Sequence, residues 1–370
     1  MSPRRRATSL LRHIDRYLGI PIVALFAAAP KRSRPADSTV RRIGILKTAA
    51  VGDTLLLAGV PEALEKRFPG ATIVMITGRD NAGAIPLLGN AIRGHVVIAP
   101  RRPVAAALAI RRLRLDILLE CGPWPRLDAL LAVGSGARYR VGFRATGQAR
   151  HYGFDAVVDH SSTTHQVENL RRLAKAVGAV DFAAPAIARP RALARTQLPA
   201  GPYAVFHPWP GGYKGHVREW PPERWVELGR RLADAYGVRI AVSGGPGDVV
   251  RSVALVGALT SAGCAAESVA GSYSLAEMAD VLAESEVVVS VNTGTMHLAA
   301  LVGSRTVSLD GPTATNRWGP VGPRVRSAVP SGGGCGFLDL GFEYAGQRLD
   351  CMSDISVDQV VRLVRELAGE

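Results

Sequence analysis

Asp53 lies at a point of the sequence where a carboxylate could take a proton from a substrate. The residues from Gly44 to Leu55 read GILKTAAVGDTL, which predicts a buried strand, a small-residue turn in which Gly52 allows a tight bend, and a helix that starts at Asp53. A carboxylate at the start of a helix often caps it. On a rigid strand-to-helix turn at the mouth of a cleft, it can instead act as a general base toward a hydroxyl group. Both interpretations stay open from this block alone.

A second block, residues 206–225, combines glycines with two cations. It reads FHPWPGGYKGHVREWPPERW and begins at the end of a strand predicted at Tyr203–His207. Lys214 and Arg218 stand in or beside its glycine-rich part, where the backbone can approach a ligand closely and the cations can neutralise a diphosphate. The alternative is that both side chains are ordinary solvated surface. We expect them, together with His207, to bind a phosphorylated ligand.

A third block, residues 290–300, reads SVNTGTMHLAA and carries hydroxyl and amide groups at the start of a helix. The segment 292–295 caps that helix, so its side chains and free amides can face phosphate or ribose oxygens. Met296 is expected in the core, and His297 fits either the core or the site. In the second half of the chain, the further residues expected to contact the same ligand are Gly244, Asn292, Thr293, Gly294, Thr295, His297 and Thr313.

Alternating strands and helices must position these three blocks. In the first half, a strand at Arg42–Lys47, a helix and a strand at Ala71–Thr77 form one βαβ unit, and the alternation continues. A proline-rich stretch at residues 185–202 predicts a linker, after which the pattern starts again. The sequence therefore predicts an α/β protein of two Rossmann-like domains facing across a cleft, with ligands beyond the carboxyl ends of the strands.

The formal net charge of +14 is concentrated at the N-terminus. Residues 1–42 hold ten Arg or Lys against two Asp, an excess of eight positive charges, and no stripe of interleaved basic and aromatic residues follows. This distribution argues against a nucleic-acid partner. Hydrophobic residues make up 47% and charged residues 21% of the chain, a balance that is typical of a folded α/β protein.

Between the basic residues of this N-terminal segment, Leu18–Ala29 reads LGIPIVALFAAA. A helix needs about 20 apolar residues to cross a bilayer, so this run is too short to span one. Its order of basic, apolar and small residues also resembles a signal peptide. We expect instead that the run dips into the headgroup region of an anionic membrane, with Lys31, Arg32 and Arg34 meeting the lipid. The alternative is a helix packed on the protein's own surface.

The cysteines and carboxylates do not predict a metal site. Four cysteines form no CxxC pair and have no His at metal-binding spacing, and the chain has no Asp-x-Asp triplet for Mg²⁺. We expect all four to be reduced thiols, although Cys335 and Cys351 are able to approach each other. No metal and no cofactor are predicted.

Together the three blocks resemble glycosyltransferase family 9, the ADP-heptose:lipopolysaccharide heptosyltransferase family. The resemblance rests on RIGIL…GDTL, on HP…REWPPERW and on NTGTMHLA…GPT…RWGP, and it extends from Arg42 to the C-terminus. It implies a GT-B fold and an inverting, metal-independent glycosyl transfer at the cytoplasmic face of the inner membrane. It also assigns the base to Asp53 and phosphate contacts to Thr293–Thr295. Two positions differ: the family's donor-binding Lys corresponds to Arg218, and its frequent Asp before Thr-Gly corresponds to Asn292.

The reaction expected from this resemblance moves a sugar from a nucleotide-diphosphate sugar, ADP-heptose or similar, to a lipopolysaccharide-core or other lipid-linked saccharide. Asp53 would deprotonate the acceptor, with Gly52 and Thr54 on the acceptor side. Two alternatives remain: a non-catalytic protein that binds sugar nucleotides or lipid surfaces, and a sugar-nucleotide epimerase on the same scaffold. An anionic membrane surface is an expected partner, and nucleic acid is not.

These expectations divide the chain into four parts. Residues 1–40 form a basic and apolar extension at the membrane interface, and residues 41–190 form the acceptor domain. Residues 200–350 form the nucleotide-sugar domain. A C-terminal helix at residues 351–370 is expected to pack back on the N-terminal domain.

Overall fold

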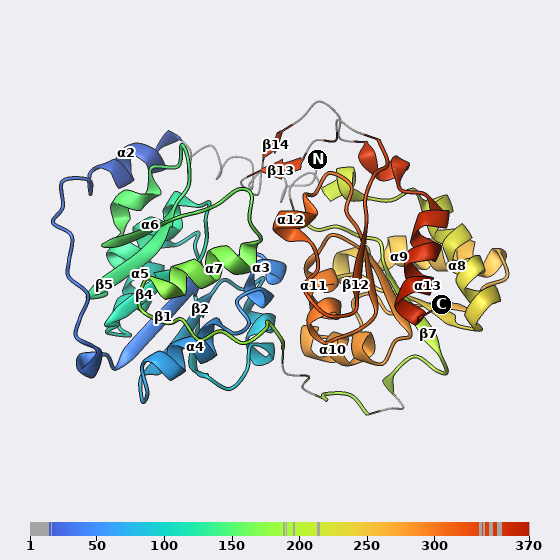
Figure 1. Ribbon diagram of the computed structural model, residues 1–370, viewed down its shortest axis with the longest axis horizontal. Helices are drawn as coiled ribbons and strands as arrows, with labels where there is room; N and C mark the ends of the chain where they lie inside the picture. Colours follow the sequence, from blue (N-terminus) through green and yellow to red (C-terminus); the bar gives the residue numbers. More distant parts are fainter. Residues whose placement is uncertain are drawn as a thin grey trace. The chain divides into compact units, whose positions relative to one another are not determined.

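The computed structural model describes residues 15, 17–187, 189, 191–194, 197–212, 215–332, 335, 337–339, 343–345 and 350–369. The chain folds into two compact units, Met1–Ala184 and Pro185–Glu370, both drawn in Figure 1. The boundary between them falls at the start of the proline-rich stretch that the sequence predicts as a linker. Each unit is described by itself below.

Unit 1 is built on a six-stranded parallel sheet in the order β3-β2-β1-β4-β5-β6. The central strands are buried almost throughout, because both faces of the sheet are covered, and this burial explains their continuous apolar runs. The strands are β1 (Arg42–Lys47), β2 (Thr72–Thr77), β3 (Ile92–Val97), β4 (Ile117–Glu120), β5 (Tyr139–Arg144) and β6 (Ala156–Asp159). The helices are α2 (Gly19–Ala24), η1 (Asp37–Thr39), α3 (Val51–Leu55), α4 (Val60–Arg67), η2 (Ala82–Leu87), α5 (Pro103–Arg111), α6 (Arg126–Gly134), η3 (Arg150–Gly153) and α7 (Gln166–Lys175).

Unit 2 has a second six-stranded parallel sheet, in the order β12-β11-β10-β7-β8-β9, and a two-stranded antiparallel pair, β13 with β14. Its strands are β7 (Tyr203–His207), β8 (Arg239–Val242), β9 (Ala266–Ser268), β10 (Val287–Val291), β11 (Thr306–Leu309), β12 (Val325–Ala328), β13 (Phe337–Asp339) and β14 (Glu343–Ala345). Its helices are η5 (Gly215–Arg218), α8 (Pro222–Tyr236), η6 (Pro246–Asp248), α9 (Val249–Ser261), α10 (Leu275–Ala283), α11 (Gly294–Leu301), α12 (Thr315–Trp318), η7 (Cys351–Asp354) and α13 (Val357–Ala368).

Both sheets have the strand order of a Rossmann fold, so the predicted pair of Rossmann-like domains is confirmed. In unit 1 the order reverses between β1 and β4, and in unit 2 it reverses between β7 and β10. Ligands of such sheets bind at this reversal, beyond the carboxyl ends of the strands. The three sequence blocks follow β1, β7 and β10, and each therefore lies at one of the two reversals.

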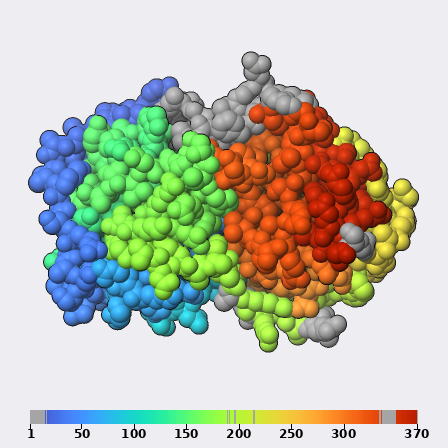
Figure 2. Space-filling model, viewed as in Figure 1, coloured from blue at the N-terminus to red at the C-terminus, as the bar shows by residue number. Residues whose placement is uncertain are grey.

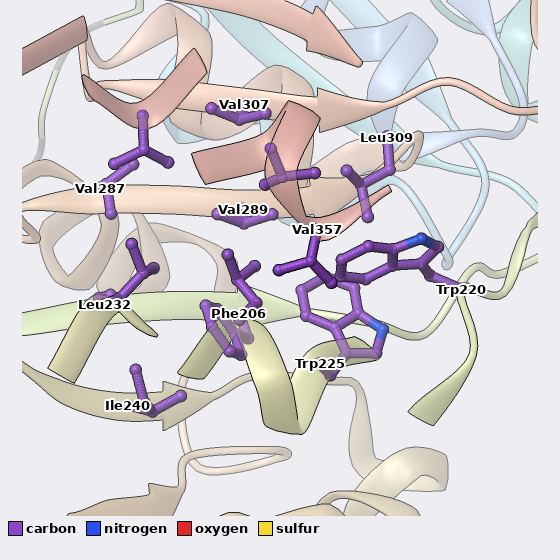
Figure 3. Packing of buried hydrophobic residues seen from close by; sticks show 14 of the residues in the cluster. Phe206, Trp220, Trp225, Leu232, Ile240, Val287, Val289, Val307, Leu309 and Val357 are labelled. Carbon is purple, nitrogen blue, oxygen red and sulfur yellow. The ribbon is translucent and has the colours of Figure 1, made fainter. Parts of the chain in front are cut away.

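Aromatic side chains and the C-terminal helix fill the core of unit 2 (Figure 3). The ring of Trp225 lies 5.0 Å from that of Phe206 and 5.2 Å from that of Trp220, measured between centroids. α13 adds Val357 and Val360 to the same core. The apolar face of this C-terminal helix is thus buried in unit 2, the unit to which it belongs.

Residues 17–40 run along the surface of unit 1, as the dark blue atoms of Figure 2 show. α2 packs on α6 and η3. Lys31, Arg32 and Arg34, which the sequence analysis places against lipid, instead donate hydrogen bonds to backbone carbonyls of unit 1 over 2.7–3.0 Å. These three cations are held by the protein itself, which corrects that part of the expectation. Within the described residues, no helix is both long enough and apolar enough to cross a bilayer.

Cys335 and Cys351 are joined by a disulfide, with Cα atoms 5.9 Å apart. The expectation that all four cysteines are reduced is therefore wrong for this pair, while Cys121 and Cys264 are free and buried. Both partners approach the loop after β11: Cys335 Sγ lies 3.7 Å from the carbonyl oxygen of Gly311, and the residue after Cys351 packs on the same glycine. Tertiary packing brings the two thiols together, and their spacing in the sequence does not show it.

Candidate functional site

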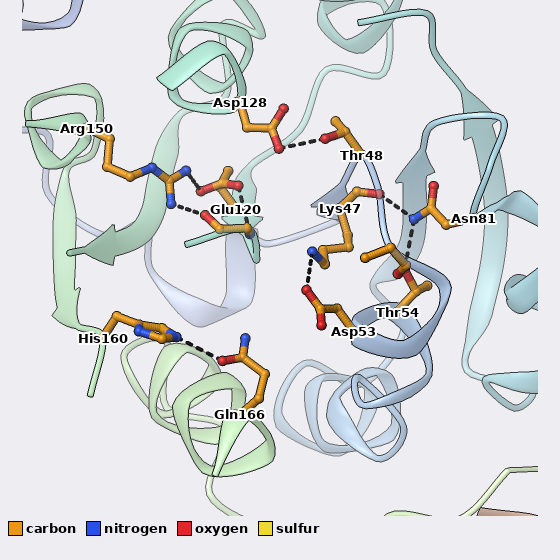
Figure 4. A network of polar contacts seen from close by, with 12 residues as sticks. Lys47, Thr48, Asp53, Thr54, Asn81, Glu120, Asp128, Arg150, His160 and Gln166 are labelled. Atoms are coloured by element: carbon orange, nitrogen blue, oxygen red, sulfur yellow. Dashed lines mark hydrogen bonds and ion pairs between the residues drawn. The ribbon is translucent and has the colours of Figure 1, made fainter. Parts of the chain in front are cut away.

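Asp53 lies in the first turn of α3, just beyond the carboxyl end of β1 (Figure 4). Lys47, the last residue of β1, donates from Nζ to Asp53 Oδ2 over 3.0 Å, and their side chains are only 5% and 15% exposed. Asp53 does not cap α3, whose N-cap residue is Ala50. Among the described residues, Asp53 Oδ1 accepts no hydrogen bond. The carboxylate is thus fixed by a cation at one oxygen and open at the other.

The turn that carries Asp53 contains one residue in an unfavourable conformation and is held in place by side-chain hydrogen bonds. Ala50 has a φ of 69°, so the left-handed residue of this turn is Ala50 and not Gly52. The hydroxyl of Thr54 is buried; it donates to the Ala50 carbonyl over 2.8 Å and accepts from Asn81 Nδ2 over 2.8 Å. Asn81 also donates to the carbonyl of Lys47 over 2.9 Å. Thr54 therefore supports the turn and is not open to an acceptor.

A second group of buried charges lies beside β1, at the carboxyl end of β4. Glu120 accepts hydrogen bonds from Arg150 and from the amide of Gly122, and neither side chain of the ion pair is exposed to solvent. Burial raises the pKa of Glu120 to about 7, although Arg150 opposes the shift. Burial also raises the pKa of Asp128, which accepts a 2.7 Å hydrogen bond from Thr48 Oγ1. Glu120 and Asp128 therefore lie at the same end of the sheet as Asp53.

His207 ends β7 at the reversal of the unit 2 sheet. Its Nδ1 lies 2.8 Å from Ser243 Oγ, the residue after β8. Burial lowers the pKa of His207 to about 4, so the ring is neutral at neutral pH. His207 can therefore offer a hydrogen bond to a ligand, but it brings no positive charge.

Arg218 joins the second and third sequence blocks. Its Nη1 donates to the carbonyl oxygen of Asn292 over 2.9 Å, and its Nη2 donates to the carbonyl of Gly211. The guanidinium is half-buried at the end of β10. Lys214, predicted beside it, lies outside the described residues. One of the two predicted cations is thus placed at the reversal between β7 and β10.

The contacts of Asn292 show why an amide, and not a carboxylate, stands at this position. Its Nδ2 donates to Asp310 Oδ1 over 2.6 Å and to the carbonyl of Trp318 over 2.9 Å. Asp310 follows β11 and is buried, and its burial raises its pKa. An aspartate at position 292 would bring a second carboxylate against Asp310, whereas the amide donates to it.

The predicted segment Thr293–Thr295 begins α11. Thr293 Oγ1 accepts from the amide of Met296 over 3.4 Å and caps the helix. Gly294 and Thr295 are only partly buried, so this end of α11 remains accessible to an anion. Met296 and His297 are buried behind it, with His297 4% exposed.

Thr313 and Gly244 lie in the loops after β11 and β8. The hydroxyl of Thr313 is buried and has no hydrogen-bond partner among the described residues. Such groups are rare in folded proteins and are often satisfied by a ligand or water. A side chain at position 244 would lie 2.8 Å from the Cβ of Asp248 and 2.9 Å from Trp209 Cδ1, so only glycine allows this loop to pack.

Sequence reasoning missed five side chains of this arrangement: Lys47, Asn81, Glu120, Arg150 and Asp310. Lys47, Glu120 and Asp310 carry a signal that the sequence does show. Like His207, each is a polar residue at or just beyond the carboxyl end of an apolar strand. Within the described part of the chain, no cluster of three or more His, Cys, Asp or Glu side chains could hold a metal ion.

Comparisons with known proteins show which family the sequence and fold are similar to. A family model described as glycosyltransferase family 9 (heptosyltransferase) matches residues 127–331. Lipopolysaccharide heptosyltransferase 1 of Escherichia coli strain K12 is 28% identical over 295 residues, which cover 74% of this chain and 88% of that protein.

Two solved structures share the fold. The E. coli ADP-heptose lps heptosyltransferase II aligns with a TM-score of 0.69 at 20% identity, over 88% of this chain and 98% of that chain. The E. coli heptosyltransferase WaaC with ADP aligns with a TM-score of 0.67 at 22% identity, over 88% of this chain and 99% of that chain. The predicted GT-B fold is confirmed.

Proposed function

The chain belongs to glycosyltransferase family 9 (heptosyltransferase), and from this premise we propose that it transfers a heptose from ADP-heptose to a lipopolysaccharide-core or related lipid-linked acceptor. The donor is proposed from the relatives, since one similar structure was solved with ADP and another is named for ADP-heptose. The acceptor is proposed from the name of the E. coli relative, a lipopolysaccharide heptosyltransferase.

Asp53 is the catalytic base of this proposal. The proton of an acceptor hydroxyl passes to Asp53 while the hydroxyl oxygen bonds to the anomeric carbon of the donor. The bond between that carbon and the diphosphate oxygen breaks on the opposite side, so the anomeric configuration inverts. Lys47 is the positioning residue, because its ammonium holds Asp53 Oδ2 at 3.0 Å and leaves Oδ1 to receive the proton.

The leaving diphosphate is assigned to unit 2. Arg218 supplies a fixed positive charge, and the partly exposed start of α11 supplies amide groups and the positive end of a helix dipole. The Thr313 hydroxyl and the neutral ring of His207 are available for hydrogen bonds. The proposal needs no divalent cation, because these groups stabilise the charge that develops on the diphosphate.

The observation that carries the proposal is the Lys47–Asp53 pair at the reversal of the unit 1 sheet. The ion pair fixes the carboxylate, and the carboxylate does not cap the helix. To test it, the full chain is incubated with ADP-heptose and a lipopolysaccharide acceptor that lacks heptose. Mass spectrometry should detect one added heptosyl group, and NMR should show the inverted anomeric configuration. Transfer that persists in EDTA supports the metal-independent route. No transfer from ADP-heptose, with transfer from another nucleotide sugar, would refute the proposed donor.

A membrane contact through α2 is a second part of the proposal. Tyr17, Leu18, Ile22 and Leu25 are 68, 56, 44 and 78% exposed, so one side of this short helix is apolar and faces solvent. Residues 1–16 add five arginines. Apolar insertion and attraction to anionic lipid together suit a peripheral protein on the inner face of the inner membrane. Replacing Leu25 by Ser should reduce sedimentation with phosphatidylglycerol vesicles, and unchanged sedimentation would remove α2 from the contact.

A further inference from the structure

A basic cavity opens at the amino-terminal edge of the unit 1 sheet, the edge opposite to the Asp53 turn. Its volume is about 620 Å³, within the roughly 300–1,000 Å³ range of small-molecule sites. It lies where α5 ends and where the chain enters β4 and β5. Four arginines, Arg111, Arg112, Arg114 and Arg138, line it together with one acid, Asp116.

Asp116, the one acid that lines this cavity, already accepts hydrogen bonds from neighbouring residues of unit 1. Asp116 Oδ2 accepts from the amides of Arg41 and Arg42 over 2.8 and 3.1 Å, and Oδ1 accepts from Arg138 over 3.3 Å. Asp116 therefore ties together the amino ends of β1, β4 and β5. With four arginines against this one lining acid, the positive charge of the cavity stays in excess.

Three of the lining arginines have no such counter-charge. Arg111, Arg112 and Arg114 are exposed, and none of them forms an ion pair with any residue that the structure describes. The side chain of Arg111 instead lies along Gly136: a Cβ built there would be in ordinary van der Waals contact with Arg111 Cγ, at 3.5 Å. An unpaired guanidinium thus lies along the wall.

Two more guanidinium groups donate hydrogen bonds to backbone carbonyls in the loops that line the cavity. Arg42 Nη1 donates to the carbonyl of Leu113 over 3.1 Å, and Arg32 Nη1 donates to the carbonyl of Ala137 over 2.8 Å. Leu113 and Ala137 are chain neighbours of lining residues. The cavity thus has four lining arginines and two more beside it, against two carboxylates: Asp116, and Asp155, which accepts from the amide of Arg32 over 3.2 Å and pairs with Arg140.

Arg114 has a backbone conformation that glycine would adopt more easily than arginine does. Arg114 has a φ of 51°, in the left-handed region, just after the C-terminal end of α5. Glycine and asparagine are the usual residues in this conformation after a helix, since they avoid the steric cost of the side chain. The attraction of cations to the end of a helix dipole would be satisfied by Arg111 and Arg112 alone. The guanidinium of Arg114 is therefore left to line the cavity.

We propose that this cavity binds a phosphate group of a phosphate ester, at a site distinct from the transferase centre. Arginine is suited to this ligand, because its planar fork donates two parallel hydrogen bonds to phosphate oxygens and keeps its charge at every physiological pH. Leu108, which is 51% exposed, supplies an apolar wall for the organic part of the ester. The phosphate ester is either a soluble metabolite or the headgroup of an anionic lipid.

Arg114→Gly tests the site without harming the fold, since glycine is favoured at a φ of 51°. The matched control is Arg230→Gln, which replaces an exposed arginine of unit 2 with a neutral residue and removes the same charge. The full chain and both variants are titrated by calorimetry with glycerol 3-phosphate. They are also sedimented with phosphatidylcholine vesicles, with and without phosphatidylglycerol.

Arg114→Gly should keep or raise the melting temperature and weaken phosphate binding about fivefold, the effect of roughly one guanidinium near an anionic group. The double variant Arg111→Gln/Arg112→Gln should weaken it further, and Arg230→Gln should bind as the unaltered chain does. Loss in the glycerol 3-phosphate titration identifies a soluble ligand, and loss confined to phosphatidylglycerol vesicles identifies a lipid headgroup. Equal binding by Arg114→Gly and the unaltered chain in both assays, or an equal loss in Arg230→Gln, overturns the proposal.

Discussion

Replacing Asn292 by Asp would place two carboxyl groups against each other in the core of unit 2. In the native protein the amide of Asn292 donates to Asp310 Oδ1 over 2.6 Å. The substitution is nearly isosteric, so it changes the charge and the hydrogen bonding but not the volume. It also restores the residue that the family often has at this position, which makes the outcome informative for relatives.

The size of the effect follows from this distance. Two unit charges 2.6 Å apart repel each other by about 6 kcal/mol at an effective dielectric constant of about 20. The folded variant avoids this repulsion by keeping one proton on the pair, whereas an aspartate in the unfolded chain loses its proton near pH 4. Because the folded state then binds more protons than the unfolded state, stability falls as pH rises, by about 1.4 kcal/mol per pH unit. Between about pH 5 and pH 8 the variant should lose about 4 kcal/mol relative to the native protein.

Urea unfolding followed by tryptophan fluorescence can measure this difference, since four of the five tryptophans lie in unit 2. Asn292→Ala is the matched control, because it loses the same hydrogen bonds without adding a charge. The aspartate variant should approach the alanine variant near pH 5 and fall well below it near pH 8. A constant gap between the aspartate variant and the native protein across this range would show that the Asn292–Asp310 contact does not exist as described.

Three further predictions concern other buried groups and the Asp53 turn. Burial raises the pKa of Glu120 from 4.5 to about 7, so the native protein should lose stability as pH rises through this interval, and Glu120→Gln should remove that slope in pH-dependent urea unfolding. His207 should have the opposite effect: its pKa falls from 6.5 to about 4, so its contribution is lost as pH falls through this interval, and His207→Gln should flatten the slope in the same titration. Ala50→Gly should release about 1 kcal/mol of left-handed strain and raise the melting temperature in calorimetry, while kcat falls because the turn holding Asp53 becomes looser.

The sequence predicts the strands and helices of this fold well where one residue pattern dominates. The strands at Arg42–Lys47 and Tyr203–His207 have their predicted limits in the structure. These elements combine a clear hydrophobic period with proline, glycine or charged residues at their ends. Local chemistry is sufficient to define them.

The site was less predictable, because its contacts join residues that are far apart in the chain. The spacing of Asn292 and Asp310 gives no sign that the amide neutralises a buried carboxylate. The same holds for Asn81, which fixes the turn of Asp53 from the loop after β2. The position of Asp53 was accessible from sequence, because a strand, a small-residue turn and a helix start follow one another locally. Its ion pair with Lys47 depends on how the turn folds back on β1.

The turnover of Asp53→Asn tests the central claim most directly. This substitution keeps the size of the side chain and removes the group that accepts the proton. If Asp53 is the general base, kcat should fall by about 10²–10⁴-fold, the usual contribution of such a group, while the melting temperature and the affinity for ADP stay close to those of the native protein. A folded Asp53→Asn enzyme that transfers heptose within about tenfold of the native rate would contradict the account.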